Sequence, residues 1–173
     1  MLKKIISGGQ TGVDQGALAA ACKLKIPIGG WAPRGFRCEG GNIPKKYADK
    51  MNEAHDLDRR DRTERNVLEG DATIIFCYDL SDSPRTRLTM DLCREHSKPY
   101  IDMVTETNRF QDNDDGYKHM AMLLDEFEII HVVGSRESKF PGIFESSKDR
   151  LVEVFRLLQR RRNLAQSGKW WRT

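Results

Sequence analysis

The chain begins with a short apolar run that ends in a glycine-rich turn, and the turn leads directly into a helical pattern. The run and the turn read Lys3-Lys4-Ile5-Ile6-Ser7-Gly8-Gly9-Gln10-Thr11-Gly12-Val13-Asp14. Glycine lets a backbone bend tightly and approach a ligand closely, and a helix N-terminus offers N–H groups and a positive dipole end to an anion. This order of strand, turn and helix indicates an α/β protein that binds a phosphate or a similar oxyanion.

The turn matches neither of two common phosphate-binding motifs. It lacks the Gly-Lys-Ser/Thr ending of the P-loop and the Gly-x-Gly-x-x-Gly spacing of dinucleotide-binding proteins. Thr11 and Asp14 also fit a capping box, in which both side chains serve the start of the helix. Because a carboxylate repels a phosphate, we expect Asp14 to face a sugar or pterin hydrogen-bond donor if a ligand binds.

Length and composition favour one globular domain. The 173 residues are 38% hydrophobic and 32% charged, and the formal net charge is +3. No apolar run approaches the ~20 residues that cross a bilayer, and the N-terminus does not read as a signal peptide. We expect a single ligand-binding domain over residues 1–163, a C-terminal tail over 164–173, a cytoplasmic location and no membrane contact.

Basic residues concentrate near the C-terminus, in the Arg160–Arg162 run. Such cations suit the end of a helix, and no nucleic-acid motif accompanies them, so nucleic-acid binding is not expected. The pair Trp170-Trp171 in the tail leaves a partner-docking or homo-oligomer contact open. The four histidines do not cluster with the four cysteines, so we expect no metal site.

Hydrophobic periodicity predicts alternating strands and helices. The expected strands are residues 3–7, 26–31, 72–78, 98–104 and 128–134, and the expected helices are residues 13–24, 59–69, 86–96, 115–126 and 145–162. This alternation implies a mostly parallel sheet that helices cover on both faces. Ligands bind at the carboxyl ends of such strands, so function is expected in the loops that follow them. Residues 35–58 form a long stretch that we expect to be irregular.

Two of these segments supply candidate ligand contacts before the third strand. The glycine-rich loop after the second strand holds Arg34 and Arg37, which could clamp an oxyanion, and Trp31, which we expect to anchor the loop. On the helix before the third strand, Arg62 and Asn66 share one face. That face either meets the ligand or binds the backbone of a neighbouring loop.

Two later loops supply the other candidates. Thr86 follows the third strand, where its hydroxyl either caps a helix or donates to a phosphate. After the fifth strand, Arg136 is a candidate anion ligand and Glu137 a candidate base. The alternative for these two residues is a surface ion pair with each other.

Five segments in chain order carry a family resemblance. They are Ser7 to Asp14, Gly29-Gly30-Trp31-x-Pro33, Arg62-Thr63-x-x-Asn66-Val67, Asp71-Ala72-Thr73 and Gly134-x-Arg136-Glu137-Ser138-x-x-Pro141-Gly142-Ile143. Together they resemble the putative molybdenum carrier family, which belongs with the circularly permuted LOG-like (lysine-decarboxylase-like) SLOG proteins. The resemblance implies a Rossmann-like three-layer αβα sandwich with a sheet of five or more strands. It also implies a homo-oligomer, dimer or tetramer, that binds molybdenum cofactor (molybdopterin) or another phosphate-bearing or nucleotide ligand.

The resemblance also implies an alternative activity. LOG-type enzymes hydrolyse nucleoside monophosphates with a Pro-Gly-Gly-x-Gly-Thr-x-x-Glu loop, and Gln15 falls where that glutamate belongs. An acid or base would therefore have to come from Asp14 or Glu137. Where the carrier family is expected to have a Gly-Gly-Thr turn after the third strand, this chain has Pro84-Arg85-Thr86.

The leading hypothesis is therefore a molybdenum cofactor carrier, and the alternative is a nucleotide-binding phosphoribohydrolase-like enzyme with Asp14 or Glu137 as its catalytic group. In either case the phosphate would lie against the glycine-rich turn, with arginines neutralising it and polar side chains fixing its orientation. The candidate binding residues are Gly8, Gly9, Gln10, Thr11, Gly12, Arg34, Arg37, Asn66, Thr86 and Arg136.

Overall fold

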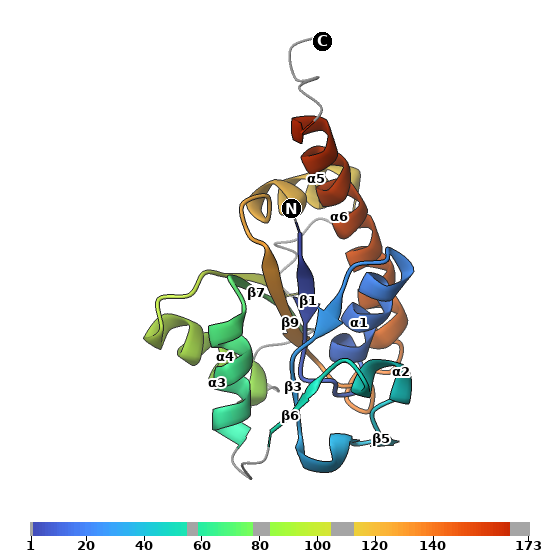
Figure 1. Ribbon diagram of the computed structural model, residues 1–173, viewed down its shortest axis with the longest axis vertical. Helices are drawn as coiled ribbons and strands as arrows, with labels where there is room; N and C mark the ends of the chain where they lie inside the picture. Colours follow the sequence, from blue (N-terminus) through green and yellow to red (C-terminus); the bar gives the residue numbers. More distant parts are fainter. Residues whose placement is uncertain (1, 55–58, 78–83, 105–112, 167–173) are drawn as a thin grey trace.

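A computed structural model of the chain describes residues 2–54, 59–77, 84–104 and 113–166 (Figure 1). Residue 78 of the third predicted strand lies outside these ranges. So do residues 167–173 of the predicted tail, including Trp170-Trp171. Among the described residues, no helix is both long and apolar enough to cross a membrane.

A five-stranded parallel sheet forms the centre of the structure, as the sequence predicts. Its strands are β1 (Lys4–Ile6), β2 (Ile28–Gly29), β7 (Ala72–Cys77), β8 (Tyr100–Val104) and β9 (Ile129–Gly134). They lie in the order β2-β1-β9-β7-β8, and every neighbouring pair is parallel. β9, the last strand that the structure describes, is therefore inserted at the middle of the sheet, between β1 and β7.

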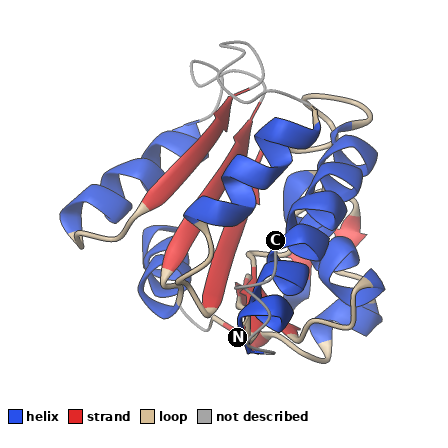
Figure 2. Cartoon of the chain, turned by 90° about the horizontal axis from the view of Figure 1, so that it is seen from above, coloured by secondary structure: helices blue, strands red, loops and turns tan. Residues whose placement is uncertain are grey.

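Helices cover both faces of this sheet (Figures 1 and 2). They are α1 (Val13–Lys23), α3 (Arg59–Glu69), α4 (Pro84–Glu95), α5 (Asp114–Leu123) and α6 (Ile143–Gln166). Helix α6 packs against α1 and α5 on one side, and α3 packs against α4 on the other. The structure is a Rossmann-like three-layer αβα sandwich. Helix α4 begins two residues earlier than predicted, because Pro84 suits the first turn of a helix.

Strand β7 connects the two halves of the core. All six of its residues are buried, as expected for a central parallel strand. Ile74 and Phe76 belong to the main core on the α1 and α6 side, whereas Ile75 and Cys77 pack with Met90 of α4. Successive side chains thus alternate between the two helical layers.

The segment over residues 31–53 is more regular than its sequence predicts. It contains β3 (Trp31–Ala32), the single-turn helix η1 (Arg34–Phe36), β4 (Arg37–Cys38), β5 (Gly41–Asn42), α2 (Lys45–Ala48) and β6 (Asn52–Glu53). Strand β3 pairs with β6 in parallel, and β4 with β5 in an antiparallel hairpin. Ile43 and Tyr47 are buried in the main core. The prediction of an irregular stretch over residues 35–58 was wrong for residues 35–53, because the parallel partner of β6 and the core that anchors Ile43 and Tyr47 come from distant parts of the sequence.

The chain leaves β7 and β9 toward opposite faces of the sheet. Helix α4, after β7, lies on the α3 side, whereas α6, after β9, lies on the α1 side. Adjacent strands whose connections diverge leave a crevice at their carboxyl ends, and ligands bind there in open α/β sheets.

Gly134 ends β9 in close contact with the backbone of β7. A Cβ atom at this position would lie 1.8 Å from the carbonyl oxygen of Phe76. The next amide, of Ser135, donates a hydrogen bond of 3.1 Å to that same oxygen. Only a residue without a side chain allows this approach, so Gly134 sets the path of the loop after β9.

We expect Gly134→Ala to lower the free energy of unfolding by about 1–3 kcal/mol, because the added methyl group overlaps backbone that cannot rotate away. Gly40→Ala is the matched control, since its Cβ would meet only the Thr11 side chain at 3.5 Å, an ordinary contact. Urea denaturation of both variants measures the difference. Equal stability of the two variants would show that the strands can separate without cost.

His131 in β9 makes stability depend on pH. Its ring is buried, Nδ1 lies 3.3 Å from the Thr73 hydroxyl, and burial, assisted by the charge of Arg62, lowers its pKa from 6.5 to about 3. Below pH 6.5 the unfolded chain binds a proton at His131 that the folded chain does not bind. Protonation therefore destabilises the fold increasingly as pH falls from 6.5 toward 3.

His131→Gln is therefore expected to flatten the decrease of unfolding free energy with pH in this range, by up to about 1.4 kcal/mol per pH unit. Urea denaturation between pH 6.5 and the acid limit of the fold measures this slope. His119→Gln removes an exposed histidine and serves as control. If both variants keep the wild-type slope, His131 does not carry the effect.

Candidate functional site

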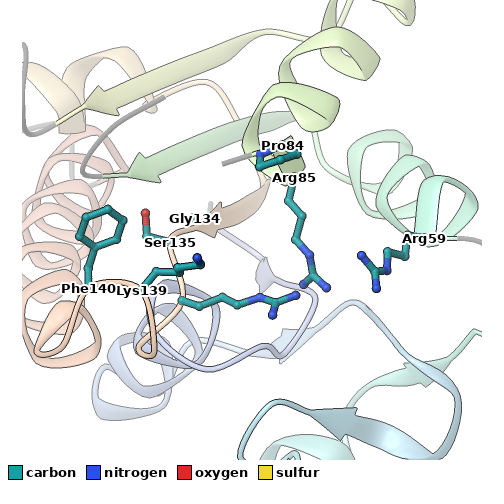
Figure 3. Close-up of a pocket in the computed structure, with 8 residues that line it drawn as sticks. Arg59, Pro84, Arg85, Gly134, Ser135, Lys139 and Phe140 are labelled. Carbon is teal, nitrogen blue, oxygen red and sulfur yellow. The ribbon is translucent and has the colours of Figure 1, made fainter. Parts of the chain in front are cut away.

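A pocket of about 210 Å³ opens at the crevice between the carboxyl ends of β7 and β9. Three segments that are distant in the sequence line it: the start of α3, the start of α4, and the end of β9 with the loop that follows (Figure 3). The lining residues are Arg59, Pro84, Arg85, Gly134, Ser135, Arg136, Lys139 and Phe140. We call this site the switch-point pocket.

Four basic side chains contribute to the switch-point pocket. In Figure 3 the side chains of Arg59 and Arg85 extend toward one another from α3 and α4. Burial, together with the positive charges of Arg136, Arg62 and Arg59, lowers the pKa of Arg85 to about 10. Among the described residues, no carboxylate forms an ion pair with Arg59 or Arg85. The pocket thus holds positive charge that a bound anion would compensate.

Asp14 and Arg62 form a second, internal charge arrangement beside Gly8. Arg62 Nη1 donates to the Gly8 carbonyl at 3.1 Å, and a Cβ on Gly8 would lie 3.0 Å from both Arg62 Nη1 and Asp14 Oδ2. Burial raises the pKa of Asp14 and the Arg62 charge opposes this rise, whereas burial lowers the pKa of Arg62 and Asp14 opposes that fall. This arrangement ties the glycine-rich turn to α3 inside the protein.

Two N–H groups of the glycine-rich turn, those of Gln10 and Thr11, already have acceptors in the protein. The Gln10 amide donates to Asp14 Oδ2 at 3.2 Å, and the Thr11 amide to Gln10 Oε1 at 3.1 Å. Gly12 is the N-cap of α1, with φ of 81° and no side-chain cap, so the predicted capping box was wrong. The first amide of α1, from Val13, donates to the Ser135 carbonyl at 3.1 Å. The turn therefore binds the loop after β9.

Asn66 holds the loop that contains Trp31. Its Oδ1 accepts from the Trp31 amide at 2.8 Å, and its Nδ2 donates to the Trp31 carbonyl at 3.1 Å. The Trp31 indole donates to Glu69 Oε2 at 2.9 Å, and the Arg65 guanidinium lies 4.8 Å from the ring centroid. The expected anchoring role of Trp31 is confirmed, and Asn66 takes the backbone-binding alternative in this structure.

Glu137 binds the N-terminus of α6. Its Oε1 accepts from the Gly142 amide at 2.5 Å and its Oε2 from the Phe144 amide at 2.9 Å. A carboxylate satisfies the free N–H groups of a first helical turn and complements the positive end of the helix. Arg136 pairs with Glu39 at 3.4 Å, so the alternative of a surface ion pair between Arg136 and Glu137 was wrong.

Of the twelve residues predicted for the site, all of which the structure describes, only Arg136 lines the switch-point pocket. Arg34 and Arg37 are exposed in the segment that carries the β4–β5 hairpin, and Thr86 is buried in the first turn of α4. The ligand contacts assigned to the other residues remain predictions.

Sequence reasoning missed three of the basic residues in the pocket. Arg85 precedes the predicted Thr86, in the turn where this sequence departs from the pattern expected for the family. Lys139 follows Ser138 in the loop after β9, and its positive charge in a loop that follows a strand could have identified it as a candidate anion ligand. Arg59 begins α3, which precedes β7. The rule that ligands bind in the loops after parallel strands therefore does not identify it.

One group of possible metal ligands lies on α3 and at the end of α4. His96 Nε2 is 2.5 Å from Glu64 Oε1, and a carboxylate oxygen of Glu95 lies within 4.8 Å of both ligand atoms. Arg60 forms a 2.6 Å ion pair with Glu95. These two carboxylates therefore already have partners within the protein.

A parallel sheet covered on both faces, with a basic pocket at its switch point, defines a Rossmann-like protein with a candidate ligand site. The sequence model of the circularly permutated YpsA SLOG family matches residues 5–155, and the chain belongs to this family. The family resemblance and the fold expected from the sequence are confirmed.

The structure is also similar to a solved structure of a putative molybdenum carrier protein from Syntrophus aciditrophicus. The two sequences are 32% identical, the TM-score is 0.75, and the match covers 89% of this chain and 94% of the other. No curated protein sequence gives a significant match.

We expect Glu137→Ala to destabilise the protein by about 1 kcal/mol, because two helix amides lose their acceptor. Glu145→Ala is the control, because it removes an exposed carboxylate from the first turn of α6 itself. It should change the free energy of unfolding by less than about 0.5 kcal/mol. Urea denaturation compares the two variants. A loss of equal size in both would show that the cap of α6 is not specific to Glu137.

Proposed function

We propose that the chain binds and carries a small ligand that bears a phosphate or similar oxyanion, with molybdenum cofactor as the particular cargo. The observation that carries the proposal is the convergence of Arg59, Arg85, Arg136 and Lys139 on the switch-point pocket. Guanidinium groups bind oxyanions through charge-assisted, often bidentate hydrogen bonds. A pocket that concentrates them at the ligand edge of a parallel sheet is suited to this class of ligand.

The chemistry of the donor set fits an oxyanion and not a bare metal cation. All four of the basic side chains present N–H donors and positive charge. Molybdenum cargo would therefore be held as molybdate or through the phosphate of its organic cofactor. The name of the similar solved structure, a putative molybdenum carrier protein, supports molybdenum as the cargo.

The dimensions of the pocket favour an oxyanion group with part of a larger ligand. Its volume of about 210 Å³ is below the range of about 300–1,000 Å³ typical of drug-sized ligands. A neighbouring hollow of about 360 Å³ shares Lys139 and Phe140 with it and continues to the start of α6. A ligand such as a pterin or nucleotide would extend from the oxyanion site along this wall.

We favour binding over hydrolysis because of the surroundings of the two candidate catalytic carboxylates. Asp14 is buried beside Arg62, and Glu137 holds the amides at the start of α6. Neither residue lines the switch-point pocket. Turnover of nucleoside monophosphates that disappears in Glu137→Gln would reverse this preference.

Two further parts of the proposal come from the sequence. They are a cytoplasmic location and homo-oligomeric assembly. Neither the location nor the assembly is needed for the pocket to bind an anion, so the binding experiments below do not depend on them.

Arg85→Ala is expected to weaken binding of pyrophosphate and molybdate by about tenfold or more, the loss that follows removal of a charge-assisted hydrogen bond. Isothermal titration calorimetry measures the affinities. The control is Arg87→Ala, which removes the same charge from an exposed position on the same helix.

Equal affinities in wild type and Arg85→Ala would refute the switch-point pocket as the binding site. A preference for molybdate over phosphate in the wild type would support molybdenum cargo. A preference for pyrophosphate would move the assignment toward a nucleotide-like ligand.

A further inference from the structure

The carboxylate of Glu39 lies among several donors at the edge of the switch-point pocket. The Ser138 amide donates to it at 3.2 Å, and the Ser138 hydroxyl at 2.8 Å. The Thr11 hydroxyl also donates to Glu39, and Arg136 Nη1 lies 3.4 Å from its Oε2. These donors come from the turn after β1 and the loop after β9, whereas Glu39 comes from the tip of the β4–β5 hairpin.

This set of donors is of the kind that binds a phosphate oxygen. It combines a backbone N–H, two hydroxyl groups and a guanidinium around one negatively charged group. The side chain of Glu39 is only 20% exposed, although it projects from an exposed hairpin. Partial burial acts to raise the pKa of Glu39, but the hydrogen bonds from Thr11 and Ser138 outweigh it and lower the pKa. The carboxylate therefore binds these donors in its charged form.

The tip of the hairpin has few other contacts. A Cβ on Gly41 would meet nothing within 4 Å, and one on Gly40 would meet only Thr11 Cγ2 at 3.5 Å. The base of the hairpin is anchored by the buried Ile43 and by Cys38, which packs on the main core. Besides its side-chain contacts, Glu39 donates its amide to Gln10 Oε1 at 2.8 Å. The tip is thus hydrogen-bonded to the rest of the protein through the side chain and the amide of Glu39.

We propose that Thr11, Ser138 and Arg136 form a second oxyanion subsite, which the carboxylate of Glu39 occupies until a ligand displaces it. The inference rests on the proposed function, because Arg136 lines the switch-point pocket and also contacts Glu39. The ligand class that fits is one with two adjacent oxyanion groups, such as a diphosphate. One group binds in the switch-point pocket, and the other replaces Glu39.

Charge determines the direction of the exchange. A diphosphate carries more negative charge than a carboxylate, so it gains more from Arg136 and from the neighbouring arginines. Glu39 competes for the same donors and, once displaced, repels the bound anion. Removal of its charge should therefore tighten the binding of a diphosphate.

The test compares Glu39→Gln with Glu53→Gln in titrations with inorganic pyrophosphate. Glu53→Gln is the matched control, because this substitution also removes one carboxylate charge from the segment over residues 31–53. The Glu53 Oε1 accepts from the Gly35 amide at 2.6 Å, whereas Arg136 pairs with Glu39. Glu39→Gln is expected to tighten pyrophosphate binding by about fivefold or more, and Glu53→Gln to leave it within about twofold of wild type.

A second readout locates the subsite. The amide resonance of Ser138 should shift when pyrophosphate is added, and the shift should occur at lower concentration in Glu39→Gln than in wild type. Unchanged or weaker affinity in Glu39→Gln overturns the proposal, as does a Ser138 amide that does not respond to pyrophosphate.

Arg85→Ala separates this inference from the proposed function. If Arg85→Ala loses affinity while Glu39→Gln behaves as wild type, the switch-point pocket stands and the second subsite falls. If Glu39→Gln binds more tightly and Ser138 responds while Arg85→Ala is unchanged, the subsite stands and the proposed function falls. If neither the wild type nor any variant binds pyrophosphate, the second subsite is wrong, and if the wild type does not bind molybdate either, the proposed function is wrong as well.

Discussion

The backbone contact between Gly134 of β9 and Phe76 of β7 is the constraint on which the functional edge depends. It brings the two strands together at their carboxyl ends, where their connections diverge to opposite faces. From this fixed point the Ser135 carbonyl accepts from the first amide of α1. The loop that carries Arg136 and Lys139 is therefore positioned by backbone contacts on both sides, which is the rigid support that a binding site needs.

Charges at this edge serve two different purposes. Asp14 and Arg62 lie beside Gly8 and compensate each other, so they stabilise the arrangement of the turn and α3. Arg59 and Arg85 face the pocket, and among the described residues no carboxylate pairs with them. A charge that is neutralised within the fold adds little to ligand affinity, whereas an uncompensated one is available to a ligand. Burial and partners therefore identify candidate binding arginines better than their number does.

The sequence predicts the strands, the helices and the parallel sheet because hydrophobic periodicity is a local signal. It also predicts Arg136, since loops after parallel strands meet at one edge. It could not decide between a ligand contact of Asn66 and its contact with the Trp31 backbone, nor between a catalytic role of Glu137 and its contact with α6. These roles depend on hydrogen bonds whose partners are set by tertiary packing. The approach of Arg59 to Arg85 likewise requires α3 to pack on α4, and no local pattern contains that information.

The clustering of basic side chains at one rim also bears on the rate at which a ligand arrives. A concave site lined by charge of one sign attracts oppositely charged molecules over distances well beyond direct contact. Dissolved salt screens this attraction within about 10 Å at 0.1 M ionic strength. The rim of Arg59, Arg85, Arg136 and Lys139 would therefore speed the capture of an anionic ligand most in dilute salt. Release depends on the short-range contacts inside the pocket and would respond far less to ionic strength.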